Sequence, residues 1–296
     1  KFGHAFLNEP VGTVPLDASG ARLGRAEAMR RAGELIRGAR RPVMRISGRL
    51  CGEGIDAFLA LAGRHRVPVD GEGLAGLDAR WAGFVDGASS TATAEGCREP
   101  GAPLPIRILV GDVAAANNVI FSEAYRERRE RIADLWIVGM DGADPASARA
   151  ASRLEPSLAS LPALLADAER TGAAVTVYVN PVELLKSGAK AAETAVLDAL
   201  VPASRPGARG AVRVVPLWNE RNAGYLFGRL AEEGRPVAPA KPDLVLDAGT
   251  RMPTDGAKLI AWGPSPRAAD LYLPLPRGYW LGGRSHLSGS EPVVTG

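Results

Sequence analysis

Cysteine and histidine are scarce in this sequence, and their scarcity excludes several kinds of site. The 296 residues include two cysteines and three histidines. Cys51 and Cys97 are too far apart for a CxxC metal motif and too few for a disulfide framework. The histidines His4, His65 and His286 are scattered along the chain. We therefore expect no metal site, no iron–sulfur cluster and no catalytic residue in this chain.

Aromatic residues and an excess of one charge are also lacking. Aromatic side chains make up 5% of the chain, and 36 basic residues nearly cancel 33 acidic ones, which leaves a net charge of +3. A nucleic-acid-binding protein concentrates its positive charge in a patch or stripe, whereas the arginines here are dispersed. Every apolar run is far shorter than the roughly 20 residues of a membrane-spanning helix. We expect neither nucleic-acid binding nor direct membrane insertion.

Common ligand-binding and catalytic motifs are absent as well. No GxGxxG fingerprint follows the apolar run that ends at Val110, and the chain has neither a GxxxxGK[ST] loop nor a GxSxG elbow. Cys51 follows a predicted strand in a glycine-rich turn, where a nucleophile would be well presented. No base lies near it in the sequence, because His65 is a full helix away. An inert small residue is the better interpretation of Cys51.

The chain does have a regular alternation of apolar runs and helix-like stretches. Strands joined through helices form parallel sheets. The predicted fold class is therefore α/β, with doubly wound, mostly parallel sheets in two Rossmann-like lobes. The main expected strands are 42–47, 67–70, 106–110, 135–138, 174–179, 212–217, 244–246, 258–262 and 269–274, and the main expected helices are 25–37, 53–65, 156–171, 181–200 and 219–230.

We expect three parts along the chain. Residues 1–24 form an extended N-terminal segment, residues 25–155 the first α/β lobe, and residues 156–296 the second. Residues 71–105 lack periodicity, so we expect them to form a long loop that serves function or contacts a partner.

Polar residues and a glycine at the ends of predicted strands form the candidate cofactor-binding site. Gly111 and Asp112 follow one strand, and the helix start beyond them would suit a phosphate group. Helix capping is the simpler role for Asp112. Asn219, Arg221 and Asn222 follow a later strand, which places them at the carboxyl edge of a sheet where ligands bind. Ligand binding and structural hydrogen bonding are equally good interpretations of these three.

Five short stretches carry a resemblance to a known family, namely Phe2–Asn8, Ile46–Arg49 with Val69–Asp70, Ile108–Asp112, Val215–Gly224 and Ala269–Pro274. Taken in their order along the chain, they resemble the molybdopterin oxidoreductase superfamily. Each stretch is short, and the shared order over nearly the whole chain supports the resemblance. Within the superfamily the chain is most similar to the large iron–sulfur subunit of NADH–quinone oxidoreductase (respiratory complex I). It is next most similar to formylmethanofuran dehydrogenase and its cofactor-free relatives in one-carbon complexes.

The first resemblance implies a non-catalytic scaffold subunit or domain of an electron-transfer complex. Val113 stands where the family has proline and no cysteine cluster is present, which favours loss of the molybdenum cofactor. Iron–sulfur clusters are then expected in partner subunits, and the expected location is the cytoplasm, where the complex is at most peripheral to the inner membrane.

The second resemblance implies an alternative function. The chain would be a subunit of a formylmethanofuran dehydrogenase-like or formyltransferase/hydrolase one-carbon complex, and it would bind either a pterin (molybdopterin) or a C1-carrier between its lobes. Under both hypotheses the expected partners are other subunits of a multi-protein redox or one-carbon complex.

Overall fold

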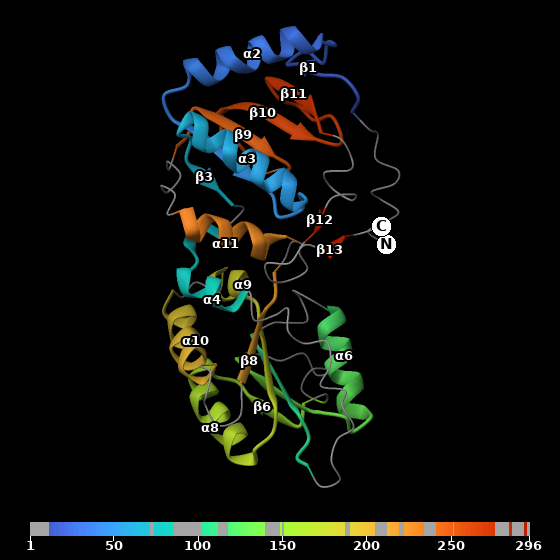
Figure 1. The fold of residues 1–296 in the computed structure, drawn as a ribbon, viewed down its shortest axis with the longest axis vertical. Coiled ribbons are helices and arrows are strands. Elements are labelled where there is room, and N and C mark those ends of the chain that lie inside the picture. Colours follow the sequence, from blue (N-terminus) through green and yellow to red (C-terminus); the bar gives the residue numbers. More distant parts are fainter. Residues whose placement is uncertain are drawn as a thin grey trace. The chain divides into compact units, whose positions relative to one another are not determined.

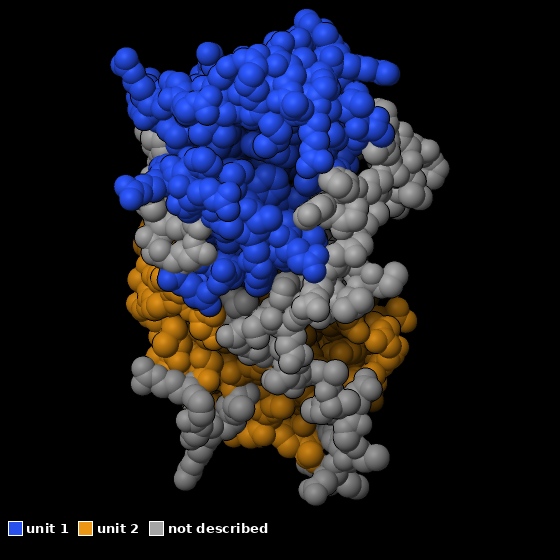
Figure 2. Space-filling view, turned by 45° about the horizontal axis from the view of Figure 1, so that its top comes forward, with its two compact units in different colours: residues 1–75, 220–287, 292–296 blue, residues 76–219, 288–291 orange. Residues whose placement is uncertain are grey.

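The computed structural model describes residues 12–71, 74–85, 102–111, 118–139, 149, 151–186, 190–204, 212–218, 222–233, 241–250, 252–275, 284–285 and 293–294. The contacts between residues divide the chain into two compact units, which Figure 2 colours blue and orange. Unit 1 combines Lys1–Ala75, Glu220–Leu287 and Pro292–Gly296, and unit 2 combines Gly76–Asn219 and Ser288–Glu291.

Unit 1 is built on a six-stranded sheet in the order β1-β11-β10-β9-β2-β3. β1 is antiparallel to β11, and all other neighbouring strands are parallel. The strands are β1 (Leu16–Asp17), β2 (Pro42–Ile46), β3 (Val69–Asp70), β9 (Leu244–Ala248), β10 (Lys258–Gly263) and β11 (Leu271–Pro274) (Figure 1). The unit also contains the helices α2 (Arg25–Gly38), α3 (Gly52–His65) and α11 (Ala223–Glu233), and the paired short strands β12 (Arg284–Ser285) and β13 (Val293–Val294).

The core of unit 1 follows from its apolar parallel strands. All residues of β9 are buried, as expected for a central strand that is covered on both faces. On one face a cluster of buried side chains joins four neighbouring strands. On the other face Phe58 of α3 packs edge-on against Trp262 of β10, with ring centroids 5.5 Å apart. The buried cluster comprises Val43, Val245, Leu259, Ala261 and Tyr272.

Unit 2 is built on a five-stranded, fully parallel sheet in the order β6-β5-β4-β7-β8. The strands are β4 (Ile106–Val110), β5 (Asp134–Val138), β6 (Arg153–Glu155), β7 (Val175–Val179) and β8 (Val212–Pro216). The helices are α4 (Ala82–Val85), α6 (Asn118–Arg129), α8 (Leu161–Thr171), α9 (Pro181–Lys186) and α10 (Lys190–Ala203). Unit 2 also has the short 3-10 helices η2 (Ala79–Trp81) and η4 (Leu158–Ser160). A third, η1 (Leu74–Gly76), contains the point along the chain where unit 1 ends and unit 2 begins.

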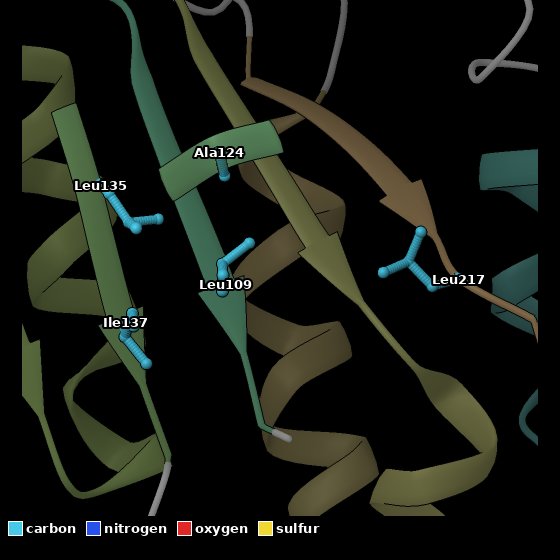
Figure 3. Packing of buried hydrophobic residues seen from close by; sticks show 5 residues of the cluster. All are labelled: Leu109, Ala124, Leu135, Ile137 and Leu217. Carbon is cyan, nitrogen blue, oxygen red and sulfur yellow. The ribbon is translucent and has the colours of Figure 1, made fainter. Parts of the chain in front are cut away.

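Apolar packing holds α6 on one face of the unit 2 sheet. Leu109 of β4 and Leu135 and Ile137 of β5 lie on the face that α6 crosses, beneath Ala124 (Figure 3). Leu217, just after β8, belongs to the same buried cluster. Burying each leucine or isoleucine contributes about 1.5–3 kcal/mol, so this cluster is a main source of stability in unit 2.

The structure confirms the predicted class, a mixed α/β fold with helices and mainly parallel sheets. The expected helices and central strands are present within a few residues of their predicted bounds, except that the single helix expected over 181–200 is divided into α9 and α10. The short strands β1, β6, β12 and β13 were not predicted. For β6 the reason is visible in its sequence, because Arg153 and Glu155 flank a single leucine and give no apolar periodicity.

The division into units differs from the two consecutive lobes expected at 25–155 and 156–296. β9 pairs with β2 along its whole length, and β10 and β11 follow it in the same sheet. The chain therefore returns to its first unit after completing the second. Periodicity along a sequence indicates strands but not which strands pair, so it did not reveal this return.

The prediction of a long loop over 71–105 was wrong for the segment that contains η1, η2 and α4. Trp81 is fully buried there. Its Nε1–H donates to Glu193 of α10 at 2.9 Å, and the backbone N–H of Asp78 donates to the same carboxylate oxygen at 2.7 Å. Residues 72–73 and 86–101 lie outside the described residues.

No helix in the described ranges is long and apolar enough to cross a lipid bilayer.

Candidate functional site

The strand order of the unit 1 sheet reverses between β2 and β9. From β2 the sheet continues to β3 on one side, and from β9 it continues to β10 and β11 on the other. In open parallel sheets ligands bind beyond the carboxyl ends of the strands at such a reversal. We call the residues there the unit 1 edge, namely 47–51 after β2, 222 before α11, 247–250 at the end of β9 and 263–267 after β10.

The turn after β2 is held by backbone hydrogen bonds and close packing. The N–H of Ser47, which is fully buried, donates to the carbonyl of Ala248 at 3.1 Å and so ties the ends of β2 and β9 together. At Gly48 an added Cβ would lie 2.8 Å from the backbone of Ala223, so α11 begins directly against this turn. Cys51 is buried and caps α3, because its Sγ accepts the N–H of Gly54 at 3.4 Å.

Asn222 connects the start of α11 to the same turn. It is buried, its Nδ2 donates to the carbonyl of Leu50 at 2.6 Å, and its N–H donates to the carbonyl of Gly48 at 2.7 Å. The sequence had associated Asn222 with the strand that precedes it, which is β8 of unit 2. The structure corrects this placement, because Asn222 satisfies two carbonyl groups of unit 1.

Tyr225 fixes α11 against α3. Its hydroxyl donates to the carboxylate of Asp56, with both oxygens 2.8 Å away, and Arg229 approaches the same carboxylate at 3.3 Å. Burial, and then the bond to Asp56, raise the pKa of Tyr225 to about 12. The two helices that begin at the unit 1 edge are therefore coupled by a polar contact further along.

A buried charge lies at the end of β9. Asp247 is fully buried, and its Oδ2 lies 2.6 Å from Nη2 of Arg267. Thr250 completes the carboxylate's environment, with its N–H donating to Oδ1 at 2.7 Å and its hydroxyl donating to Oδ2 at 2.9 Å. A buried carboxylate is tolerated only when it is paired and hydrogen-bonded in this way.

A second arginine lies beside this pair. Arg45 of β2 is the register partner of Asp247, so both side chains leave the same face of the sheet. The Nη1 of Arg45 donates to the carbonyl of Pro253 at 2.6 Å, and its Nε lies 3.6 Å from Asp70. Next to Arg267 is a small hollow, and Gly249, Trp262, Ser265 and Tyr272 also line it.

The unit 2 sheet has its own reversal of strand order, between β4 and β7. Gly111 follows β4 with a φ of 71°, a left-handed conformation that favours glycine, and its N–H donates to the carbonyl of Val138 at 2.9 Å. Asn180 follows β7 and is buried. Its Oδ1 accepts the N–H groups of Val182 and Glu183 at 3.0 and 3.1 Å, so it caps α9.

Two of the predicted site residues can be placed. Gly111 lies at the edge of the unit 2 sheet and Asn222 at the unit 1 edge. Asp112, Asn219 and Arg221 lie outside the described residues.

The sequence interpretation missed Asp247, Thr250 and Arg267. A signal for the first two was present, because a single acidic residue interrupts the apolar run of β9 two residues before Gly249 and three before Thr250. Arg267 had no such signal, since nothing in the sequence indicates that it contacts Asp247.

Among the residues that the structure describes, no group of three or more His, Cys, Asp or Glu side chains is arranged to hold a metal ion.

Comparison with known proteins gives a likeness among solved structures. No protein-family model and no curated protein matches the sequence. Among solved structures, the chain is similar to a chain in the crystal structure of the formyltransferase/hydrolase complex FhcABCD from Methylorubrum extorquens, determined in complex with methylofuran. The TM-score is 0.55 at 15% sequence identity, and the match covers 93% of this chain and 91% of that chain. The two chains share a fold.

This likeness agrees with the second resemblance noted in the sequence, to the formylmethanofuran-related proteins of one-carbon complexes. It gives no support to the first resemblance, to respiratory complex I. The neighbour is part of a multi-subunit complex, which agrees with the expectation that this fold works with partner subunits.

Proposed function

We propose that this chain is a non-catalytic subunit of a multi-protein one-carbon complex of the formyltransferase/hydrolase kind. The observation that supports the proposal best is the extent of the structural likeness. It covers nearly all of both chains, and therefore both units of this one, and does not rest on a single common α/β motif. The family-like motifs along the sequence are compatible with this group, since the formylmethanofuran-related proteins were the second of the two resemblances that they gave.

We further propose that the two units are Rossmann-like lobes of a molybdopterin-oxidoreductase-like fold that no longer uses its metal. A pterin-held metal takes a thiolate, hydroxyl or carboxylate ligand from the protein. At the unit 1 edge Cys51 is buried as a helix cap, and Asp247 contacts Arg267 and Thr250. The engagement of these two side chains supports the proposal that neither is a metal ligand and that the role of the chain is structural.

The test is to purify the full-length chain, with an affinity tag, from cells that contain its natural partners. We expect it to co-purify in a fixed ratio with subunits that transfer or hydrolyse formyl groups, and we expect the purified complex to show that activity. Cells that lack this chain serve as the control, and they should yield less assembled complex.

Two other results would contradict the proposal in different ways. A chain that purifies alone, or with the iron–sulfur subunits of NADH–quinone oxidoreductase, would refute membership of a one-carbon complex. Molybdenum or tungsten in a one-to-one ratio with this chain would leave the complex in place but refute the non-catalytic role.

A further inference from the structure

We propose that Arg267 binds an oxyanion, namely the carboxylate or phosphate end of a small molecule, at the unit 1 edge. This inference concerns unit 1 alone and does not depend on which complex the chain joins. It rests on the way the fold holds Arg267, on the charges around it, and on the hollow beside it.

The guanidinium of Arg267 is held from its buried side. Nη2 has no exposed surface and faces Asp247 at 2.6 Å, in a charge contact that is not aligned as a hydrogen bond. Asp247 is itself fixed by the N–H and hydroxyl of Thr250. About a quarter of the Arg267 side chain (24%) remains exposed, and this exposed part excludes Nη2. A guanidinium has five N–H donors, so some donors remain on the exposed side of Arg267. The contact of Nη2 with Asp247 on the buried side orients them.

The charges at this edge favour an anion at the exposed side of Arg267. Within the described part of the chain, Asp247 is the only charged group in contact with Arg267. An anion bound to the exposed donors would be nearer to the guanidinium than to Asp247 behind it, so attraction exceeds repulsion. Arg45, the register partner of Asp247, adds a second positive charge on the same face of the sheet. The carboxylate that Arg45 contacts is that of Asp70, on β3.

The hollow beside Arg267 indicates how much of a ligand could enter. It has room for about one water-sized group. One oxygen of a carboxylate or phosphate would fill it, and the rest of the molecule would lie outside. Guanidinium groups bind both of these anions through paired N–H donors, so the chemistry of the site fits either. Its position, beyond the carboxyl ends of β9 and β10, is where parallel sheets bind ligands.

The experiment is to titrate the full-length chain with formate and, separately, with inorganic phosphate, and to follow binding by calorimetry. We expect saturable binding of at least one anion, with a Kd on the order of 1 mM. A response to formate alone identifies a carboxylate ligand, and a response to phosphate alone identifies a phosphate ligand.

The key variant is the double substitution Asp247→Asn with Arg267→Gln, which removes both charges and leaves no buried ion unpaired. We expect it to unfold near the wild-type temperature and to bind the anion at least about tenfold more weakly, a loss of about 1.4 kcal/mol. Arg267→Lys keeps the ion pair but loses the planar fork, so it should bind more weakly while remaining folded. Arg126→Gln removes the same charge from an exposed site on α6 of unit 2 and should bind as the wild type does.

Two outcomes would overturn the inference. One is that neither anion binds to the wild-type chain. The other is that the double variant, shown to be folded by circular dichroism, binds as tightly as the wild type.

Discussion

Replacing Gly48 by alanine is the sharpest test of how the unit 1 edge is built. The added Cβ would lie 2.8 Å from both N and Cα of Ala223, and 2.9 Å from its Cβ. The N and Cα are backbone atoms at the start of a helix, and the Cβ is fixed to them, so none of the three can rotate away and α11 or the turn must move. Overpacking of this kind costs about 1–3 kcal/mol.

A second loss follows from the same movement. The carbonyl of Gly48 accepts the N–H of Asn222 at 2.7 Å, and moving α11 away weakens that bond. A typical hydrogen bond contributes about 0.5–1.5 kcal/mol. We therefore expect Gly48→Ala to lower the free energy of unfolding by about 2–4 kcal/mol, measured by urea denaturation followed by circular dichroism. With a slope of about 2 kcal/mol per molar urea, the midpoint should fall by about 1–2 M.

The matched control is Gly228→Ala, in α11 of the same unit. An added Cβ there meets nothing within 4 Å. Since alanine is a better helix former than glycine, this variant should be more stable than the wild type by about 0.5–1 kcal/mol. If Gly48→Ala proved as stable as the wild type, the close contact between the turn after β2 and the start of α11 would be wrong.

Three further predictions test other contacts. Glu193→Ala removes the buried carboxylate that accepts from Trp81 and Asp78 and contacts the ammonium of Lys190. It should lower the free energy of unfolding of unit 2 by about 3–5 kcal/mol, measured by urea denaturation followed by tryptophan fluorescence. An unchanged midpoint would contradict the anchoring role of Glu193. Asn222→Ala leaves the carbonyl of Leu50 without its buried donor and should cost about 1–3 kcal/mol in the same assay, whereas a ligand-binding residue with no structural role would leave stability unchanged. Tyr225 has a pKa raised from 10.0 to about 12, so its contribution to stability is fully present below pH 10 and is lost as the pH rises from 10 to 12. Ultraviolet titration should show this late ionisation in the wild type and a smaller late step in Tyr225→Phe, while ionisation complete near pH 10 would refute it.

The sequence was sufficient to predict the helices and strands, but not which strands pair with each other. β2, β7 and β8 are apolar runs between turn signals, and such runs identify strands wherever they occur. The pairing of β2 with β9 joins residues about two hundred positions apart, and no local pattern encodes it. The expected division into consecutive lobes differed from the observed units for that reason.

The candidate site shows the same limit. Asn222 stood out as a polar residue near a strand end, yet its partner Leu50 lies 172 residues earlier in the chain. Trp81 lies in a stretch without periodicity, and its burial depends on a carboxylate more than a hundred residues away, Glu193. Side chains that act through distant contacts are visible only after folding brings those contacts together.

The discontinuous course of unit 1 has a consequence for how the protein is made. Every strand of the unit 2 sheet is synthesised before β9 leaves the ribosome, so unit 2 can fold while the chain is still growing. β2, β3 and α3 are translated before unit 2, but they must wait for β9, β10 and β11 to complete their sheet. These strands are therefore made before unit 2 but protected after it, and during that delay their apolar side chains are exposed to aggregation.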